Sequence, residues 1–319
     1  MKKLIVILVM LVAINASGQW VQMDGIYGGD VRAIAVNGNI VFAGTYRNGV
    51  YISTNNGSNW TQTSLNNKSI NSFALISNRL IASTNDNQIY FTTNNGVSWT
   101  LSSTSFPSYC LATLGNNVFA GAMNGLRIST DYGTSWTQTV FNAQSIACLT
   151  ILGSNIFAGT MGGGVYLITN NGANWSQTSL NNMSINSMAS SGNNIFAGTQ
   201  DSGVYRSTNN GTTWVKTSLN NRTVYSLGIS GNNIFAGTIS SGVYLSTNNG
   251  TDWAQTSLNN KDVYSIAISG TNIFAGEKYG GVYLSTNNGT NWQQMALSNN
   301  SIKTFGVDGN NIFAGTYKS

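Results

Sequence analysis

The apolar residues of this chain fall in short alternating runs that recur in a fixed order. The segment from Val224 to Ser257 shows the unit, in which VYSLGIS, GNNIFAGT, ISSGVYLST and NNGTDWAQTS follow one another. Short runs rich in Val, Ile, Phe, Tyr and Thr, bounded by Gly and Asn, are typical of β-strands. The pattern therefore predicts four strands, named A to D, at residues 224–230, 233–238, 242–246 and 253–257.

Tryptophan marks the same position in every copy of this unit. The tryptophans from Trp60 to Trp292 recur every 39 residues, apart from one interval of 37. Four antiparallel strands in such a unit form a small sheet that is apolar on both faces and must be covered by its neighbours. The sequence predicts an all-β fold, a β-propeller of four-stranded antiparallel blades. A β-helix also repeats, but its rungs are usually shorter.

The ends of the repeat array predict how the ring closes. Seven complete blades are expected, with A strands that start near Val31, Ile70, Tyr109, Ile146, Ile185, Val224 and Val263. The segment from Ile302 to Thr316 matches strands A and B, whereas the segment from Trp20 to Gln22 matches strand D alone. We expect an incomplete eighth blade that the N-terminal strand closes, which hides the sheet edges. Its strand C is missing, so truncation after Ser319 is the alternative.

The first residues have the pattern of a secretory signal peptide. Lys2 and Lys3 precede an apolar stretch from Leu4 to Ile14, and small residues follow it up to Gly18. The apolar stretch is too short to span a bilayer. We expect a signal peptide at 1–18, a propeller at 19–319, and a released secreted, extracellular or periplasmic protein without a membrane span.

Composition removes several classes of chemistry. Charged residues make up 7% of the chain, against about a quarter in typical proteins, and there is no histidine and one glutamate, Glu277. A Ser-His-Asp triad, a Cys-His pair and a histidine-bound metal are therefore excluded. The basic residues are scattered singly, unlike a nucleic-acid footprint. We expect no cofactor, no metal and no nucleic-acid partner, and a monomeric protein.

The turn between strands C and D carries the most regular motif. It reads Ser-Thr-Asn-Asn-Gly-Thr-Thr-Trp from Ser207 to Trp214 and Ser-Thr-Asp-Tyr-Gly-Thr-Ser-Trp from Ser129 to Trp136. Asn or Asp at the third position can bond amides of its own turn, and glycine supplies a positive φ. The tryptophan opens strand D with a large apolar side chain.

This motif resembles the Asp-box, or bacterial neuraminidase repeat, whose pattern is Ser-x-Asp-x-Gly-x-Thr-Trp. The resemblance covers all the C–D turns and implies a propeller in which these turns are structural. The third positions and the tryptophans concerned are Asn55, Trp60, Asn94, Trp99, Asp131, Trp136, Asn170, Trp175, Asn209, Trp214, Asn248, Trp253, Asn287 and Trp292. Asn replaces Asp in all but one turn, and Ile168 replaces the first serine of the fourth.

Families with the Asp-box include sialidases, other glycan-cleaving hydrolases, sortilin-type receptors and propellers of the photosystem II assembly-factor type, so the resemblance implies no single activity. A sialidase site needs three arginines around a carboxylate, and none of the arginines here has the expected Arg-Ile-Pro context. The acids Asp86, Asp201, Asp262 and Glu277 are assigned to different blades, so no pair of carboxylates is expected. Catalysis is not expected, with a divergent sialidase-like glycoside hydrolase as the alternative.

The loops between strands B and C differ from repeat to repeat, while strand B and the C–D turn barely change. Strand alternation predicts that the B–C and D–A loops share one face of the ring. We expect a non-catalytic binding or scaffolding module that uses this face for a protein or a glycan, although unconstrained loops also vary. The candidate ligand-binding residues are Arg47, Asp86, Asp201, Lys278 and Tyr279.

Overall fold

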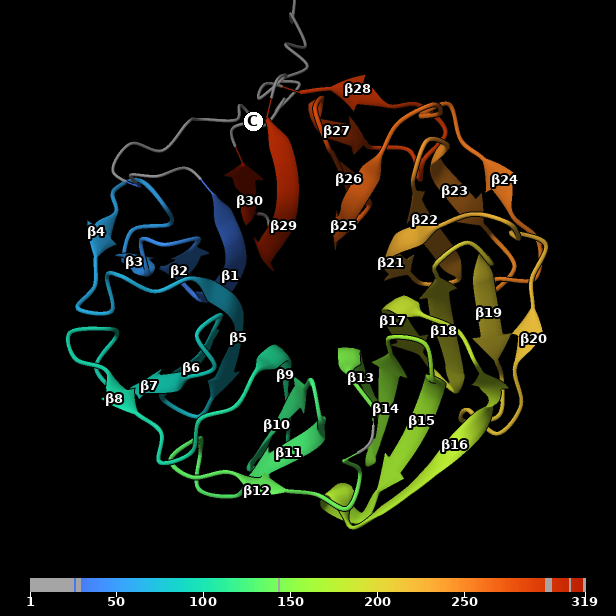
Figure 1. The fold of residues 1–319 in the computed structure, drawn as a ribbon. Helices are drawn as coiled ribbons and strands as arrows, with labels where there is room; N and C mark the ends of the chain where they lie inside the picture. Colours follow the sequence, from blue (N-terminus) through green and yellow to red (C-terminus); the bar gives the residue numbers. More distant parts are fainter. Residues whose placement is uncertain (1–25, 27–29, 143, 296–299, 310, 318–319) are drawn as a thin grey trace, which may run out of the picture.

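The protein forms a closed ring of small antiparallel sheets, as Figure 1 shows. A computed structural model describes residues 26, 30–142, 144–295, 300–309 and 311–317. Seven sheets have four strands each, and consecutive strands pair as neighbours. The predicted all-β class and the four-stranded propeller blades are therefore confirmed.

The four strands of each blade run from the centre of the ring outward (Figure 1). The A strands are β1 (Val31–Asn37), β5 (Ile70–Ile76), β9 (Ser108–Leu114), β13 (Ile146–Leu152), β17 (Ile185–Ser191), β21 (Val224–Ser230), β25 (Val263–Ser269) and β29 (Ser301–Asp308). The B strands are β2 (Ile40–Thr45), β6 (Arg79–Thr84), β10 (Asn117–Ala122), β14 (Asn155–Thr160), β18 (Asn194–Thr199), β22 (Asn233–Thr238), β26 (Asn272–Glu277) and β30 (Asn311–Tyr317).

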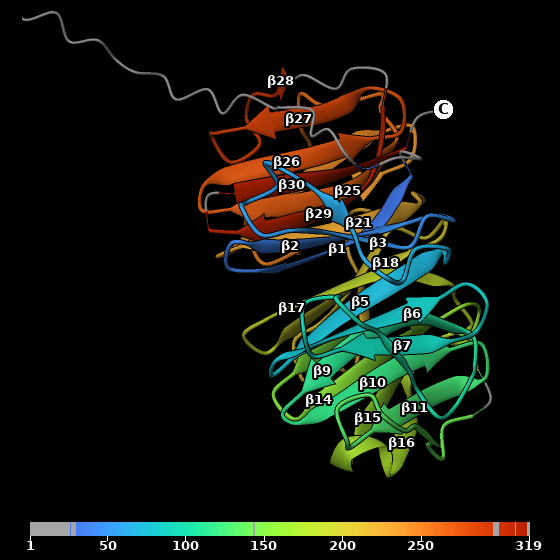
Figure 2. The same ribbon diagram turned by 90° about the vertical axis from the view of Figure 1, so that its left-hand side faces the viewer.

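The two outer strands are shorter. The C strands are β3 (Val50–Ser53), β7 (Ile89–Thr92), β11 (Gly125–Ser129), β15 (Gly164–Thr169), β19 (Val204–Ser207), β23 (Gly242–Ser246) and β27 (Gly281–Ser285). The D strands are β4 (Thr61–Gln62), β8 (Thr100–Leu101), β12 (Thr137–Gln138), β16 (Asn174–Asn181), β20 (Val215–Lys216), β24 (Ala254–Gln255) and β28 (Gln293–Gln294). Figure 2 shows neighbouring sheets stacked face to face around the ring.

Between the seventh blade and the first lies a sheet of two described strands. β29 and β30 pair with each other, and β29 packs between β25 and β1. The predicted strand at Trp20–Gln22 and the predicted signal peptide at 1–18 lie outside the described residues. The structure thus shows seven four-stranded blades, and closure of an eighth blade by the N-terminal strand stays a prediction.

Strand D is shorter than the sequence suggests. In the sixth blade it was expected at 253–257, but β24 contains only Ala254 and Gln255. The backbone N–H of Trp253 donates instead to Oγ of Ser218 in the preceding blade, at 2.9 Å. This amide therefore ties two blades together and is not part of the ladder.

Buried phenylalanines of the B strands form the contacts between blades. Phe157 is fully buried, and it lies under the C–D turn of the next blade. A Cβ atom added to Gly211 of that turn would lie 2.3 Å from the Phe157 ring. Gly250 has the same relation to Phe196 one blade further on. Because interiors are close-packed, this position has no room for a side chain.

Hydrogen bonds inside the C–D turn explain its sequence. In the fifth blade the Gly211 N–H donates to Oγ of Ser207 at 2.9 Å, and this hydroxyl donates to Oδ1 of Asn209 at 3.0 Å. Oδ1 of Asn209 also accepts the Thr213 N–H at 2.9 Å. Six turns share this scheme, centred on Asn55, Asn94, Asp131, Asn209, Asn248 and Asn287.

The fourth C–D turn differs from this scheme. Ile168 stands at the serine position and is fully buried, so it packs and supplies no hydroxyl. Asn170 has a positive φ of 48° and begins a short 3-10 turn (Asn170–Gly172). The carbonyl of Asn170 accepts the Ala173 N–H at 3.1 Å. Strand β16 then continues for eight residues, and Trp175 is 41% exposed. The fourth turn therefore differs from the other six in its hydrogen bonds, in its backbone and in the strand that follows it.

The two cysteines are free thiols at equivalent positions of neighbouring blades. Burial raises the pKa of the Cys110 thiol to about 12, and the pKa of Cys148 is also raised, chiefly by burial. We expect the native protein at pH 8 to react with iodoacetamide about a thousandfold more slowly than the urea-unfolded chain, because the thiolate is the nucleophile. Mass spectrometry would measure both rates, and equal rates would contradict the burial.

Candidate functional site

The B–C and D–A loops meet on one face of the ring, as the strand alternation predicts. The Tyr46 N–H, in a B–C loop, donates to the carbonyl of Asp30, which precedes strand A, at 2.8 Å. On the opposite face, the Asn56 N–H of a C–D turn donates to the carbonyl of Asn39 in an A–B turn at 3.1 Å. We call the first of these surfaces the loop face.

A β-bulge occurs near the start of the eight described inner strands, at the second residue in seven of them and at the third residue of β29. In β1, Val31 pairs with Thr45 and Ala33 with Gly44, so Arg32 is the extra residue. Bulges redirect a side chain out of the regular ladder. The eight bulge residues, called the bulge ring, are Arg32, Asn71, Tyr109, Ala147, Asn186, Tyr225, Tyr264 and Lys303.

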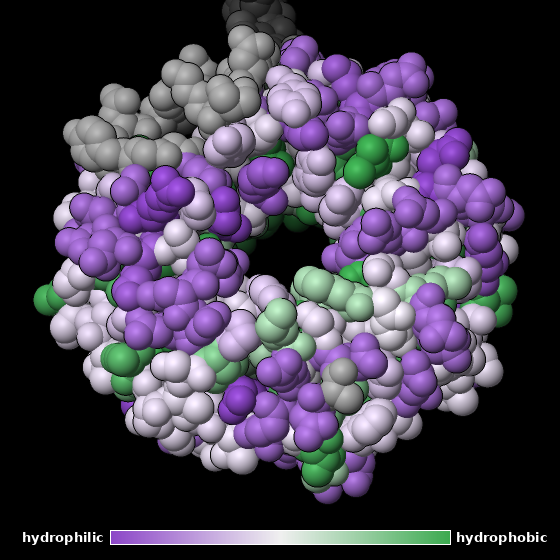
Figure 3. Space-filling model, in the orientation of Figure 1, coloured by the Kyte–Doolittle hydropathy of each residue, from purple (hydrophilic) through white to green (hydrophobic). Residues whose placement is uncertain are grey.

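The centre of the molecule is open. The space-filling view in Figure 3 shows a hole at the centre of the ring of blades. The ring is seen there from the face at which strand β30 ends. The A strands are innermost, and their first residues lie at the loop face. The bulge ring is therefore at the rim of this opening.

One half of the bulge ring combines aromatic rings with cations. The rings of Tyr225 and Tyr264, on neighbouring blades, are 4.8 Å apart between centroids and tilted by 48°. Nζ of Lys303, on the next inner strand, lies 4.9 Å from the Tyr264 ring centroid. These three residues form a continuous line across β21, β25 and β29.

The line continues into the first blade. The guanidinium of Arg32 lies 4.0 Å from the ring centroid of Tyr46, and that of Arg47 lies 4.8 Å from the same ring. Arg32 also forms an ion pair of 3.1 Å with Asp30, which is buried. Both guanidiniums are therefore held against one tyrosine, and one of them has a carboxylate partner.

The B–C loop of the seventh blade adds a further cation. Nζ of Lys278 lies 5.0 Å from the ring centroid of Tyr279, whose side chain is 57% exposed. Hydrogen bonding to Tyr279, followed by the influence of the Tyr264 hydroxyl, raises the pKa of Lys278, so it is charged at neutral pH. Burial raises the pKa of Tyr264, a hydrogen-bond partner of Lys278, so its hydroxyl is neutral there.

These side chains make one surface, called the cationic arc, that crosses the sixth, seventh and first blades and the two-stranded sheet between them. Its members are Arg32, Tyr46, Arg47, Tyr225, Tyr264, Lys278, Tyr279 and Lys303.

The other half of the bulge ring is neutral and used for structure. The side-chain amide of Asn71 donates to the carbonyl of Ser108 in the next blade at 3.1 Å. Asn186 donates in the same way to the carbonyl of Val224 at 3.2 Å. Together with Ala147 and Tyr109, they give this half no charged group. The opening is therefore asymmetric in charge.

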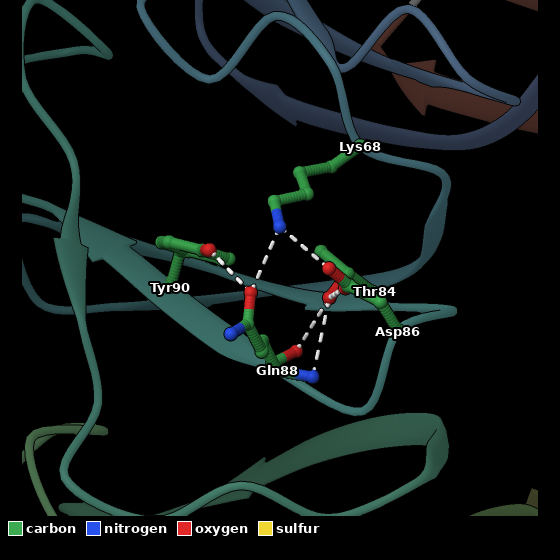
Figure 4. A network of polar contacts seen from close by, with 5 residues as sticks. All are labelled: Lys68, Thr84, Asp86, Gln88 and Tyr90. Carbon is green, nitrogen blue, oxygen red and sulfur yellow. Dashed lines mark hydrogen bonds and ion pairs between the residues drawn. The ribbon is translucent and has the colours of Figure 1, made fainter.

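Asp86 belongs to a structural network in the second blade (Figure 4). Its carboxylate pairs with Nζ of Lys68 at 2.5 Å and accepts from Oγ1 of Thr84 at 2.5 Å. Lys68 also contacts Oε1 of Gln88, which accepts from the Tyr90 hydroxyl. The hydrogen bond to Asp86 raises the pKa of Lys68, although burial opposes this shift. The network ties a D–A loop to a B–C loop.

Asp201 has a similar role in the fifth blade. Its carboxylate accepts from Oγ1 of Thr223 at 2.6 Å, and its backbone N–H donates to the same oxygen at 3.3 Å. Of the five candidate residues, Arg47, Lys278 and Tyr279 thus lie in the cationic arc, whereas Asp86 and Asp201 hold loops together in other blades.

Sequence reasoning missed Arg32, Tyr225, Tyr264 and Lys303. The available signal was the second residue of each A strand, which varies in charge and size between apolar or small neighbours. A strand read with regular alternation buries or exposes this position uniformly. Only the bulge, which appears in the pairing of β1 with β2 and its equivalents, places it at the opening.

Two acids come closer than the sequence assignment predicted. Asp262 and Glu277 were placed in different blades, but Asp262 immediately precedes β25, whose Val263 pairs with Glu277. Their side chains serve different partners. Oδ1 of Asp262 accepts the Ser240 N–H at 2.8 Å, while Glu277 is buried, with its carboxylate beside Gly280. Although their backbones are close, Asp262 and Glu277 do not form an exposed pair of carboxylates.

Glu277 stands where five other blades have threonine. In the sixth blade, Oγ1 of Thr238 donates to the carbonyl of Gly242 at 2.8 Å, and the corresponding partner here is Gly281. We expect Glu277→Thr to raise the free energy of unfolding by about 1 kcal/mol, because it adds this hydrogen bond and removes a buried acid. Urea denaturation would measure the change. Unchanged or lower stability would show that the glutamate stabilises the blade.

Two arginines brace the face opposite the loops. Nη1 of Arg79 donates to Oγ1 of Thr134 in the next blade at 2.9 Å. Nη1 of Arg206 donates in the same way to Thr251 at 2.7 Å. Each of these guanidiniums thus contacts the C–D turn of the next blade.

Among the residues that the structure describes, no group of three or more Cys, Asp or Glu side chains is arranged to hold a metal ion. The described part of the chain also contains no helix of the length and apolar character needed to cross a membrane.

Comparison with known proteins identifies the fold. No family model matches the sequence, and no curated protein matches it. The computationally designed Ika8 protein is similar in structure, with a TM-score of 0.76 and 13% identity over 92% of this chain and 95% of its own. YCF48 from Cyanidioschyzon merolae has a TM-score of 0.62 and 13% identity over 83% of this chain and 98% of its own.

A GH74 xyloglucanase from Xanthomonas campestris has a TM-score of 0.64 and 14% identity over 92% of this chain and 59% of its own. YCF48 is also seen bound to D1 peptide, in a structure with a TM-score of 0.60 and 14% identity over 80% of this chain and 92% of its own. At these identities the likeness concerns the fold alone: the chain is a β-propeller with seven four-stranded blades.

Proposed function

We propose that this chain is a secreted, non-catalytic propeller that binds a protein or a glycan through its loop face. The observation that carries the proposal is the cationic arc. Four of its side chains are cations, and they gather with four tyrosines on the loop face. Aromatic residues and arginine are enriched where proteins bind partners.

The contrast between the two faces supports the same proposal. Six C–D turns repeat one hydrogen-bond scheme, which uses their polar side chains inside the fold. The cations of the arc, in contrast, occur only in the first blade, the seventh blade and the sheet between them, and the equivalent positions of the other blades carry no cation. Residues that recur in every blade are explained by their role in the fold. Charged residues that occur at one site only are not, and we infer that they serve binding.

The YCF48 structure with D1 peptide supports a peptide or protein as the partner, since in that structure a propeller of similar fold is bound to a peptide. The proposed secretion rests on the N-terminal pattern of Lys2, Lys3 and the apolar stretch behind them. The Asp-box resemblance of the C–D turns is compatible with either a binding or an enzymatic propeller.

A divergent glycoside hydrolase is the second candidate, and the likeness to the GH74 xyloglucanase is the observation in its favour. Two features support the non-catalytic alternative. Glu277 is buried, and Asp86 and Asp201 are bonded to residues of D–A loops. Arg79 and Arg206 are used on the opposite face, so these two are not available for a cluster of three arginines around a substrate carboxylate at the loop face.

The experiment is a direct comparison of binding with turnover. The purified protein would be applied to arrays of peptides and of glycans, and incubated in parallel with fluorogenic glycosides that include a sialoside. We expect retention of a defined set of array ligands and no release of the fluorophore. Hydrolysis of a glycoside that is lost in Glu277→Gln would contradict the proposal and support the hydrolase.

A further inference from the structure

We propose that the cationic arc binds an acidic peptide segment, with its carboxylates on Arg47, Lys278 and Lys303. This inference rests on the proposed binding function and names the ligand class and the residues that recognise it.

The first support is the unbalanced charge of the arc. Within the described part of the chain, the ion pairs are Arg32 with Asp30 and Lys68 with Asp86. Arg47, Lys278 and Lys303 thus have no carboxylate within ion-pair distance among those residues. All three lie on the loop face, on the first blade, the seventh blade and the sheet between them. An anionic ligand would supply the missing charges.

The second support is the way the cations are held. Arg47 is placed over Tyr46, Lys278 over Tyr279, and Lys303 over Tyr264. A cation over an aromatic face keeps its N–H groups available at its outer side, and the ring restricts its motion. Restricting a long side chain beforehand lowers the entropy lost when a carboxylate binds.

The same contacts favour peptide over sugar. A sugar ring binds tyrosine by lying flat on its face, but cations of the protein already lie over the faces of Tyr46, Tyr264 and Tyr279. The groups of the arc that a ligand can contact are separated positive charges and the edges and hydroxyls of the tyrosines. Carboxylates spaced along an extended chain match this arrangement, because each can reach one cation.

The third support is the contrast with the neutral half of the same opening. Asn71 and Asn186 stand at the positions of Lys303 and Arg32, and their amides bond to backbone carbonyls of the next blade. A neutral side chain at this position can therefore form the hydrogen bond to the next blade. A cation such as Arg32 or Lys303 is therefore not required at this position to hold neighbouring blades together.

The test uses fluorescence anisotropy with a labelled peptide of alternating glutamate and glycine, and with a matched peptide in which glutamine replaces glutamate. We expect the glutamate peptide alone to bind, and its affinity to fall with added salt, since exposed charges are screened. In Lys278→Gln/Lys303→Gln the affinity should fall about 25-fold, at about fivefold for each cation. Arg222→Gln, a cation of the same face outside the arc, and Lys216→Gln, on an outer strand, should bind as the parent does.

Each outcome decides between this inference and the proposed function. Equal binding of the two peptides, or equal losses in Lys278→Gln/Lys303→Gln and Arg222→Gln, would overturn the acidic-peptide assignment. If acidic glycans from the array bind through these lysines while the glutamate peptide does not, the loop face still binds and only the ligand class is wrong. If the array ligands bind equally after Lys278→Gln/Lys303→Gln and after Arg47→Ala, the loop-face proposal itself fails.

Discussion

Replacing Gly203 with alanine should lower the free energy of unfolding by about 3 kcal/mol or more, the sum of left-handed strain and overpacking. Gly203 has a φ of +82°, and a Cβ atom there would lie 2.0 Å from the carbonyl oxygen of Leu219. The obstacle is backbone of the D–A loop and cannot turn aside. The Gly203 N–H also donates to the Arg222 carbonyl at 2.8 Å, so a shift would cost that bond.

The matched control is Gly231→Ala. Gly231, in an A–B turn of the next blade, also has a positive φ, of +58°, but no atom lies within 4 Å of the added Cβ. Only the conformational strain applies there, which is about 1 kcal/mol. Urea denaturation of both variants measures the difference. Equal losses would mean that the close approach of the D–A loop to strand C does not exist in solution.

The second large effect distinguishes two tryptophans at the same repeat position. Trp136 is 5% exposed and meets the Phe106 ring edge to face, at 5.6 Å between centroids, whereas Trp175 is 41% exposed. We expect Trp136→Ala to cost about 3–5 kcal/mol and Trp175→Ala less than half of that.

The reason is that the fourth C–D turn differs and leaves Trp175 partly at the surface, although its ring still contacts Phe141 and Tyr166, at 5.1 and 5.6 Å between centroids. Thermal unfolding followed by circular dichroism would rank the two variants. A ranking in the opposite order would contradict the described fourth turn.

Much of the architecture could be predicted from the sequence because a repeat reports it several times. In the sixth blade the expected strands 224–230, 233–238 and 242–246 are β21, β22 and β23. The outermost strand was overestimated, because Trp253 looks like a strand residue but gives its amide to Ser218 of the neighbouring blade. A bond between blades leaves no local pattern.

The site could be predicted less completely. Arg47, Lys278 and Tyr279 stood out because their loops vary and carry charge. Asp86 stood out for the same reason, yet it pairs with Lys68, a residue from another loop. Arg32 and Lys303 were missed because a bulge shifts the register by one residue, and alternation along a single strand does not reveal which residue is extra.

The two faces of the ring are assigned different roles, binding for the loop face and structure for the C–D turns. One paired measurement tests this assignment. Two variants would be compared for binding of a ligand retained on the arrays and for melting temperature. The first variant is Arg47→Ala/Lys278→Ala/Tyr279→Ala. The second is Ser207→Ala, which removes the buried hydroxyl that bonds Gly211 and Asn209.

We expect the triple variant to lose binding and keep its melting temperature, because its side chains are held only at the surface. We expect Ser207→Ala to bind normally and to melt lower by several degrees, because an unsatisfied turn costs about 1–3 kcal/mol. A triple variant that binds as the parent does, or that melts as early as Ser207→Ala, would contradict the assignment of binding to the loop face.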